Sequence, residues 1–261
     1  MSFAKLPEKP LFVANWKMYK NYHETCAWFT DNATELAELA HHAHLIICPT
    51  FPTLSFATQK CIEAQISLGA QECSAHTTGP FTGQVNAQTL YQVGCTYCII
   101  GHSERRRELH ETSDTVAQKA ALLLAHEITP IVCIGEQQAP TTQEAVINEL
   151  ELQLHPLARI NEQRFVNQRL CIAYEPAWAI GSNTVPSSDH LRTVFTFLRS
   201  YCTQAFPLFN LAFLYGGSVS MSTITPLTQV PGIDGFLVGS AALDFQNFKN
   251  IVLSSSIRVT E

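Results

Sequence analysis

Eight short apolar runs recur along the chain, each followed by a segment with helical spacing. They cover residues 11–16, 45–49, 67–71, 97–101, 130–135, 170–175, 211–216 and 235–239. Most are continuously apolar rather than alternating, which is typical of strands buried on both faces of a parallel sheet. Parallel strands need crossover connections, usually helices, so this pattern restricts the chain to an α/β fold.

The intervening segments carry signals that start helices. Capping-type residues stand at 112–113 and 187–188, and residues 141–144 have the spacing of a capping box. A first helix is predicted by an apolar stripe of Cys26, Phe29, Ala33, Leu36 and Ala40.

Two architectures fit this alternation, a closed (β/α)₈ barrel and an open doubly wound sheet. The open sheet would need a glycine-rich phosphate loop after its first strand, and Lys17, Met18 and Tyr19 stand there instead. No linker or shift in composition divides the chain. We therefore predict a single (β/α)₈ barrel, with residues 1–261 forming one catalytic domain.

Charge and cysteine content limit the partners and the compartment. The formal net charge of −6 disfavours nucleic acid and anionic membranes as partners. No apolar run approaches the ~20 residues of a membrane span, and the first residues do not resemble a signal peptide. The nine scattered cysteines indicate free thiols in a reducing compartment, so we expect a cytoplasmic protein.

Two short segments look like metal-binding motifs, but we expect neither of them to bind a metal. Cys95 and Cys98 form a C-x-x-C pair within a predicted strand, where residues three apart face opposite sides. The histidines at residues 41–44 have no acidic or cysteine partner at ligand spacing. Cys133, inside another strand, is interpreted as a buried, inert thiol.

Polar residues at the carboxyl ends of barrel strands are the candidates for chemistry. Alternation places Asn15 and Lys17 toward the barrel mouth and Trp16 toward the helices. A lysine there needs an anionic partner, which is either a ligand or a structural carboxylate. The sequence leaves these two possibilities open.

The fourth run ends at His102, directly before a helix that begins with Ser103 and Glu104. The positive end of a helix dipole keeps a nearby histidine neutral, and a neutral imidazole can exchange a proton with a developing enolate. The alternative is that His102 only caps the helix. The arginines at residues 105–107 are more typical of salt bridges than of catalysis.

The sixth run ends at Glu175, which is followed by Pro176, Trp178 and Ile180. A carboxylate shielded by such a loop loses solvation, which strengthens it as a base. The last two runs end in glycine-containing loops, residues 215–218 and 239–241, where barrels commonly bind phosphate through backbone N–H groups.

Together these segments resemble triosephosphate isomerase over nearly the whole chain. The matching segments are residues 14–18 (Ala-Asn-Trp-Lys-Met), 79–83 (Gly-Pro-Phe-Thr-Gly), 101–106 (Gly-His-Ser-Glu-Arg-Arg), 132–136 (Val-Cys-Ile-Gly-Glu), 173–181 (Ala-Tyr-Glu-Pro-Ala-Trp-Ala-Ile-Gly), 215–218 (Tyr-Gly-Gly-Ser) and 235–239 (Gly-Phe-Leu-Val-Gly). The resemblance implies the interconversion of dihydroxyacetone phosphate and glyceraldehyde 3-phosphate, in glycolysis and gluconeogenesis, without cofactor or metal.

The resemblance also implies residue roles. Lys17 and Asn15 would bind substrate, His102 would be the neutral electrophile and Glu175 the base, a pairing for which this family is the well-known example. The residues that would bind the phosphate are Gly181, Ser218, Gly239 and Ser240.

A homodimer is implied as well, with Phe81, Thr82 and Gly83 in a loop that inserts into the second subunit. In the family, an arginine at the position of Arg105 braces this contact by pairing with a glutamate, which Gln84 replaces here.

Two further departures concern the phosphate site and the loop. Ser240 replaces a common glycine but keeps its N–H group. The loop that follows Glu175 ends in residues 182–186, Ser-Asn-Thr-Val-Pro, where Pro186 restricts the backbone of Val185. This hinge differs from the common family pattern, and its effect on loop motion is open.

Two other functions are compatible with a barrel. An aldolase or lyase would use Lys17 in a Schiff base, but the sixth strand ends in Glu175 rather than a lysine. A non-catalytic phosphate-binding barrel would be expected to have lost its acid, base or lysine, and all three are present.

Overall fold

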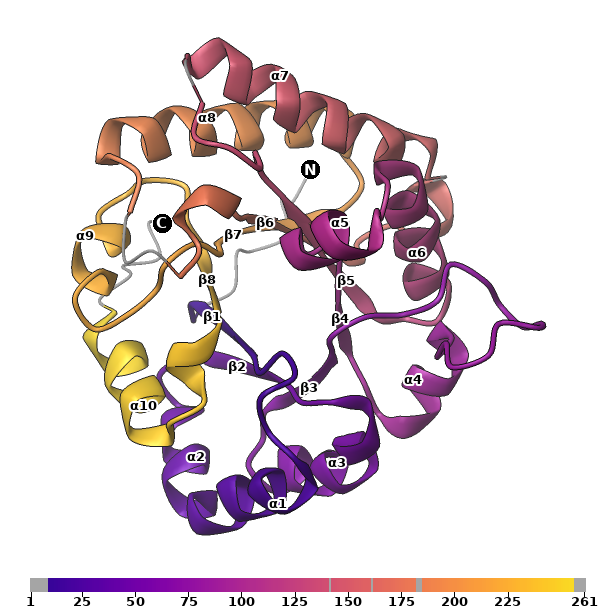
Figure 1. The fold of residues 1–261 in the computed structure, drawn as a ribbon, viewed down its shortest axis with the longest axis vertical. Coiled ribbons are helices and arrows are strands. Elements are labelled where there is room, and N and C mark those ends of the chain that lie inside the picture. The colour runs from indigo at the N-terminus through magenta and orange to yellow at the C-terminus, as the bar shows by residue number, and fades with distance from the viewer. Residues whose placement is uncertain (1–8, 141, 161, 182–184, 256–261) are drawn as a thin grey trace.

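The computed structural model describes residues 9–140, 142–160, 162–181 and 185–255. Eight parallel strands close into a barrel in sequence order, from β1 through β8 and back to β1 (Figure 1). The strands are β1 (Leu11–Asn15), β2 (His44–Cys48), β3 (Ser67–Ala70), β4 (Tyr97–Ile100), β5 (Thr129–Ile134), β6 (Arg169–Tyr174), β7 (Asn210–Tyr215) and β8 (Gly235–Val238). The predicted (β/α)₈ barrel is confirmed, and every predicted strand lies within one residue of an observed one.

Helices connect successive strands and surround the barrel (Figure 1). The α-helices are α1 (Tyr22–Asp31), α2 (Ala33–Leu39), α3 (Leu54–Glu63), α4 (Ala87–Val93), α5 (Ser103–Leu109), α6 (Ser113–Ala125), α7 (Gln143–Leu154), α8 (Ser188–Ala205), α9 (Ile224–Thr228) and α10 (Phe245–Ser254). Short 3₁₀ segments are η1 (Phe51–Thr53), η2 (His155–Arg159), η3 (Glu162–Arg164), η4 (Ala177–Ala179) and η5 (Ser240–Ala242).

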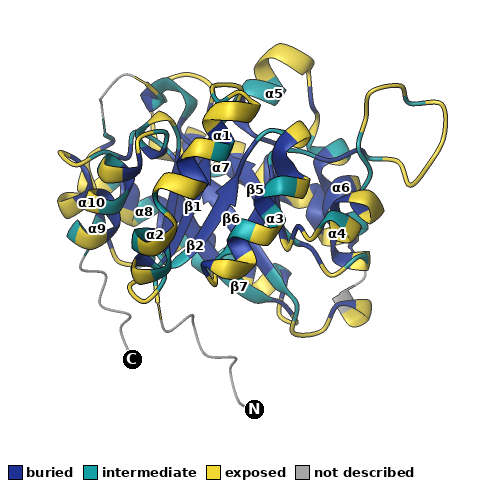
Figure 2. Ribbon diagram, turned by 90° about the horizontal axis from the view of Figure 1, so that it is seen from below, coloured by how far each residue is buried: buried dark blue, intermediate teal, exposed yellow. Residues whose placement is uncertain are grey.

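The core has two layers because neighbouring residues of a strand face opposite sides. Leu11 and Val13 of β1 belong to the cluster that fills the barrel interior. Phe12 and Ala14 belong to the larger cluster between the barrel and the helices. Figure 2 shows the strands in dark blue inside helices whose outer faces are exposed. The continuous apolar runs of the sequence therefore reflect burial on both faces.

Local capping explains where several helices begin. Thr112 and Ser187 cap α6 and α8, each accepting a hydrogen bond from a backbone N–H three residues later. In α7 the cap is Thr142, which accepts from the N–H of Ala145, so Glu144 is not placed to complete the predicted capping box. The box assumed Thr141 as the cap, and that residue lies outside the described residues.

The predicted first helix is two helices. The break falls at Asn32, whose φ of −115° and ψ of 13° are not helical. Its side-chain amide donates to the carbonyl of Trp28 at 2.7 Å, so a polar side chain competes with the helix backbone there. The break turns the chain, so that Ala33 of the expected stripe is exposed while Leu36 is buried.

The cysteine pair was wrongly placed on opposite faces. Cys95 precedes β4, where strand alternation does not apply, and both Cys95 and Cys98 belong to the layer between barrel and helices. All nine cysteines of the chain are free. Cys133 is buried, and its pKa is raised by burial and by the charge of Glu175, as expected of an inert thiol.

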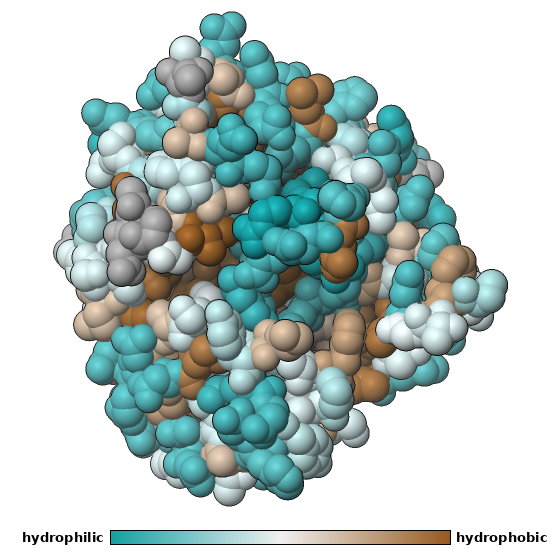
Figure 3. Space-filling view, in the orientation of Figure 1, coloured by the Kyte–Doolittle hydropathy of each residue, from teal (hydrophilic) through white to brown (hydrophobic). Residues whose placement is uncertain are grey.

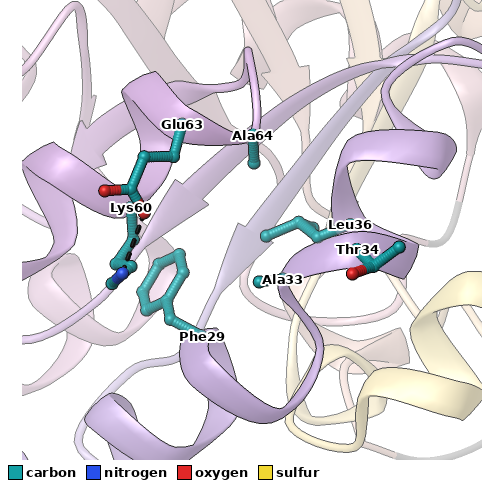
Figure 4. Close-up of a pocket in the computed structure, with 7 residues that line it drawn as sticks. All are labelled: Phe29, Ala33, Thr34, Leu36, Lys60, Glu63 and Ala64. Carbon is teal, nitrogen blue, oxygen red and sulfur yellow. Dashed lines mark hydrogen bonds and ion pairs between the residues drawn. The ribbon is translucent and has the colours of Figure 1, made fainter.

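A small cavity in the helical layer is unrelated to the strand ends. It measures about 210 Å³ and lies among α1, α2 and α3, with Phe29 and Leu36 on its walls (Figure 4). The exposed Lys60–Glu63 ion pair, at 2.8 Å, stands at its rim. In the part of the chain that the structure describes, no helix has the length and apolarity needed to cross a membrane.

We predict that Gly235→Ala destabilises the barrel where it closes. A Cβ added to Gly235 would lie 2.1 Å from the carbonyl oxygen of Leu11, so the β8–β1 ladder would have to shift. We expect a loss of about 3 kcal/mol or more in the free energy of unfolding, measured by urea denaturation.

The control is Gly83→Ala, where no described atom beyond the neighbouring residues lies within 4 Å of the added methyl group. It should cost only about 1 kcal/mol, from its left-handed backbone. Equal losses in the two variants would show that closure does not depend on this contact.

Candidate active site

Two buried side chains from different strand ends meet over the barrel. His102 follows β4 and Glu175 follows β6, and their Nε2 and Oε1 atoms lie 3.4 Å apart. The two residues are only 6% and 2% exposed. Because water is largely excluded from these two side chains, the imidazole and the carboxylate interact strongly with each other and with any charge that develops beside them.

The tautomer of a neutral His102 ring follows from its position as the N-cap of α5. The backbone N–H of Glu104 donates to Nδ1 at 3.3 Å, so Nδ1 is an acceptor. In a neutral ring the proton then lies on Nε2, the atom that faces Glu175. The two interpretations of His102 are thus compatible, since the helix cap fixes the tautomer that an electrophilic histidine needs.

Glu175 is held by the backbone around it. Its own N–H donates to the carbonyl of Ile134 at 2.7 Å, and Ser103 donates its N–H to Oε2 at 3.3 Å. Two glycines leave room for it, since a Cβ on Gly135 would lie 2.0 Å from the Glu175 carbonyl oxygen. A Cβ on Gly216 would lie 2.7 Å from Cγ of the same residue.

Lys17 lies just past β1 in a left-handed conformation, with φ of 50°. Its N–H donates to Oδ1 of Asn15 at 3.1 Å, and its Nζ donates to Oε1 of Glu104 at 2.7 Å. Burial opposes ionisation of Glu104, but the hydrogen bond and charge of Lys17 outweigh it and lower the pKa of this carboxyl. The structural carboxylate that the sequence allowed is therefore present, on the same short helix that His102 caps.

Gln71 was missed by sequence reasoning, although it supports Lys17. Its amide donates to the carbonyl of Lys17 at 2.7 Å and to that of Cys48 at 2.9 Å. A left-handed lysine is unfavourable by itself, and this contact holds it in place. The available signal was a polar residue closing the apolar run 67–71, but its partners could not be read from sequence.

The candidate phosphate residues come from three loops. Gly239 is next to Lys17, since a Cβ there would be 3.7 Å from Cε of the lysine, and Ser240 begins η5 beside it. Ser218 donates its hydroxyl to the carbonyl of Ala179 at 2.6 Å, which joins the loop after β7 to η4. Gly181 has φ of 71°, and among the described residues no atom beyond its chain neighbours lies within 4 Å of a Cβ added there.

The segment after β6 is anchored at both described ends. Trp178 in η4 donates its indole N–H to Oε1 of Glu136 at 2.8 Å. On the other side Val185 packs against the outer core and Pro186 is buried. The unusual hinge thus ends in an apolar contact, while residues 182–184 lie outside the described residues.

Glu136 belongs to the segment 132–136 that resembles the family, but it was given no role from the sequence.

Arg105 keeps ionic partners despite the replacement at Gln84. It pairs with Glu72 and, at 3.3 Å, with Glu111, both from its own chain. Gln84 instead accepts a hydrogen bond from the Ser74 hydroxyl at 2.5 Å. Within the described ranges no three potential metal ligands gather at one place.

Figure 3 shows the face of the molecule that carries α5, in the orientation of Figure 1. Hydrophilic surface gathers over α5, beside hydrophobic surface near the middle of the face.

Comparison with known proteins agrees with this geometry. The family model for triosephosphate isomerase matches residues 10–255. This chain belongs to the triosephosphate isomerase family. It is 37% identical to the triosephosphate isomerase of Thermus thermophilus over 242 residues, which cover 91% of this chain and 95% of the relative. It is 36% identical to that of Solibacter usitatus, over 94% of this chain and 98% of the relative. It is therefore an isomerase.

We predict that Gly216→Ala impairs isomerase activity by moving Glu175. The added methyl group would lie 2.7 Å from Cγ and 3.2 Å from Oε1 of Glu175, so the carboxylate must shift. A displacement of this kind can cost about 100-fold in rate, and we expect a fall in kcat of roughly 10–100-fold.

Steady-state kinetics would measure this effect, with Ser222→Ala, an exposed change in the same loop, as the control. An unchanged kcat in Gly216→Ala would mean that the position of Glu175 is not limiting.

Proposed function

We propose that this triosephosphate isomerase family member interconverts dihydroxyacetone phosphate and D-glyceraldehyde 3-phosphate through an enediolate, as a step of glycolysis and gluconeogenesis. The observation that carries the proposal is the buried contact between Nε2 of His102 and the carboxylate of Glu175. It sets a carboxylate and an imidazole side by side, a pairing that suits proton transfer between adjacent carbons.

In this mechanism the carboxylate of Glu175 removes a proton from the carbon next to the carbonyl. The Nε2–H of His102 stabilises the developing oxyanion by hydrogen bonding and proton donation. Glu175 then returns its proton to the neighbouring carbon. His102 regains a proton from the hydroxyl on the first carbon, which becomes the new carbonyl group, while the proton it donated stays on the former carbonyl oxygen. No cofactor is needed, because the substrate's carbonyl group itself accepts the electron pair.

Lys17 and Asn15 would hold the substrate and offset negative charge. The Nζ of Lys17 has further N–H donors beyond its bond to Glu104, so the ion pair orients the lysine without consuming it. Backbone N–H groups of Gly181, Ser218, Gly239 and Ser240 would bind the phosphate. The proximity of Gly239 to Lys17 supports this arrangement. Nothing in the structure favours a Schiff-base lyase or a non-catalytic barrel.

We further propose that the whole chain, residues 1–261, is one catalytic domain that works as a homodimer in the cytoplasm. The loop between β3 and α4 extends away from the barrel (Figure 2), and Thr82 and Gly83 within it are exposed. The ring of Phe81 stacks on His76 at 3.7 Å, which stiffens the loop. A stiff exposed loop is suited to insertion into a second subunit, and the nine free cysteines suit a reducing compartment.

We predict that Glu175→Gln removes most activity and leaves the fold intact. An amide of nearly the same shape can keep the bond from the Ser103 N–H but cannot act as a base. A general base contributes about 10²–10⁴-fold, so kcat should fall by that order. The exposed Glu108→Gln should be neutral. Near-normal kcat in Glu175→Gln, with circular dichroism unchanged, would overturn the assignment of the base.

We predict that Lys17→Ala weakens binding of a phosphorylated hydroxamate, an analogue of the enediolate, by roughly 10–100-fold. Stability should change little, because the lost ion pair with Glu104 is partly exposed to solvent. Calorimetry measures the binding, with Lys60→Ala as a control ion pair. Extensive unfolding with unchanged affinity per folded molecule would support a purely structural lysine.

We predict that sedimentation equilibrium gives twice the chain mass at micromolar concentration. Phe81→Asp with Thr82→Asp would bury charge in the proposed interface and should raise the dimer dissociation constant at least about 10-fold. Val166→Asp, at an exposed site on another loop, is the control. A wild-type monomer would refute the dimer while leaving the chemistry of His102 and Glu175 untouched.

A further inference from the structure

Four side chains, from the loop after β5, the end of β6, η4 and the start of α8, form a hydrogen-bonded chain beside the candidate active site. Tyr174 is the last residue of β6, directly before Glu175, and its hydroxyl donates to Oε1 of Glu136 at 2.9 Å. The indole of Trp178 donates to the same oxygen at 2.8 Å. On the far side His190, in the first turn of α8, places Nε2 at 2.8 Å from the Tyr174 hydroxyl.

The direction of every bond follows from counting protons. An ionised Glu136 can only accept, and a tyrosine hydroxyl has a single proton to give. Because that proton goes to Glu136, the oxygen of Tyr174 is free to accept, and His190 must be the donor. His190 therefore carries a proton on Nε2, and all the donors point along one path toward Glu136.

The neighbouring charges support this assignment. Burial lowers the pKa of His190, and the charge of Glu136 opposes this without overcoming it, so the ring is neutral near pH 7. Burial and Glu136 raise the pKa of Tyr174, which keeps its hydroxyl protonated. A neutral histidine and a protonated tyrosine are the two states that the bond directions require.

The position of the Glu136 carboxylate depends on the hydrogen bonds that Tyr174 and Trp178 donate to it. Among the described residues, its buried Oε2 atom has no hydrogen-bond partner, so the carboxylate is held through Oε1. Its backbone carbonyl also accepts from the N–H of Ala177 at 3.0 Å. One residue thus fixes both Ala177 and Trp178, the start of the segment that follows Glu175. Loosening of Glu136 would be transmitted to that segment.

We propose that His190 is a positioning residue for this segment. By donating to Tyr174 it directs the tyrosine proton onto Glu136, and Glu136 in turn holds Trp178. His190 does not touch the reacting atoms, and its effect reaches Glu175 through the backbone on either side of that base. The effect on catalysis rests on the isomerase function proposed above, whereas the hydrogen-bonded path does not.

The test compares His190→Gln with His190→Leu. Glutamine can still donate an N–H to the tyrosine oxygen, and leucine cannot. The readout independent of activity is the indole ¹H–¹⁵N resonance of Trp178, assigned by its loss in Trp178→Phe. We expect His190→Leu to shift or broaden this resonance and to lower kcat/KM about 5-fold, the effect of one lost hydrogen bond. His190→Gln should stay near wild type in both measurements.

Tyr174→Phe provides a second route to the same answer. It removes the hydroxyl that links the two halves, so it should disturb the Trp178 resonance as His190→Leu does. The double variant should then add little further change, as expected of residues on one path. If His190→Leu does not fold, His190→Ala, which also lacks the N–H donor, takes its place in the comparison with His190→Gln. His23→Leu, in the first turn of α1, controls for loss of a surface histidine.

The outcomes separate this proposal from the proposed function. A Trp178 resonance unchanged in His190→Leu, or changed equally in His190→Gln, would overturn the positioning role. The Trp178 resonance could change in His190→Leu but not in His190→Gln while the wild-type protein shows no isomerase activity. That result would support the positioning role of His190 and refute the proposed isomerase function.

Discussion

Closure of the barrel between β8 and β1 is the constraint on which the rest of this structure depends. Gly235 pairs with Leu11 in that ladder, and the approach of the two backbones leaves no space for a side chain. Closure brings all the strand ends into one ring, so residues remote in sequence become neighbours. His102 and Glu175 can then meet at 3.4 Å from strands that are not hydrogen-bonded to each other.

The site is held by groups that have no chemistry of their own. Lys17 keeps a left-handed backbone because Gln71 binds its carbonyl, and Glu175 keeps its position because Gly135 and Gly216 leave room for it. Such features cost stability locally, and the surrounding buried core compensates for that cost. A rigid barrel can therefore fix a lysine, an imidazole and a carboxylate more closely than flexible loops could.

The sequence predicted elements well and contacts between them poorly, for a physical reason. Apolar runs report burial directly, so each strand was located to within one residue. The predicted runs extended one residue past the observed strands, to Trp16 after β1 and to Glu175 after β6. The proposed acid, base and lysine were found because their residue types are unusual at strand ends. Gln71 and Glu136 were missed because their importance lies in partners that only the folded chain brings near.

The same distinction explains why a helix outside the barrel bears on the active site. His190 has no signal in sequence beyond its place in the first turn of α8, and its meaning comes from the tyrosine hydroxyl that faces it. A hydroxyl has one proton, so fixing its acceptor on one side requires a donor on the other. The direction of a single hydrogen bond thus couples α8 to Glu136 and to the residues that flank Glu175. Polar networks that are satisfied in only one arrangement select that arrangement, which is how buried side chains far from the substrate help to define a catalytic geometry.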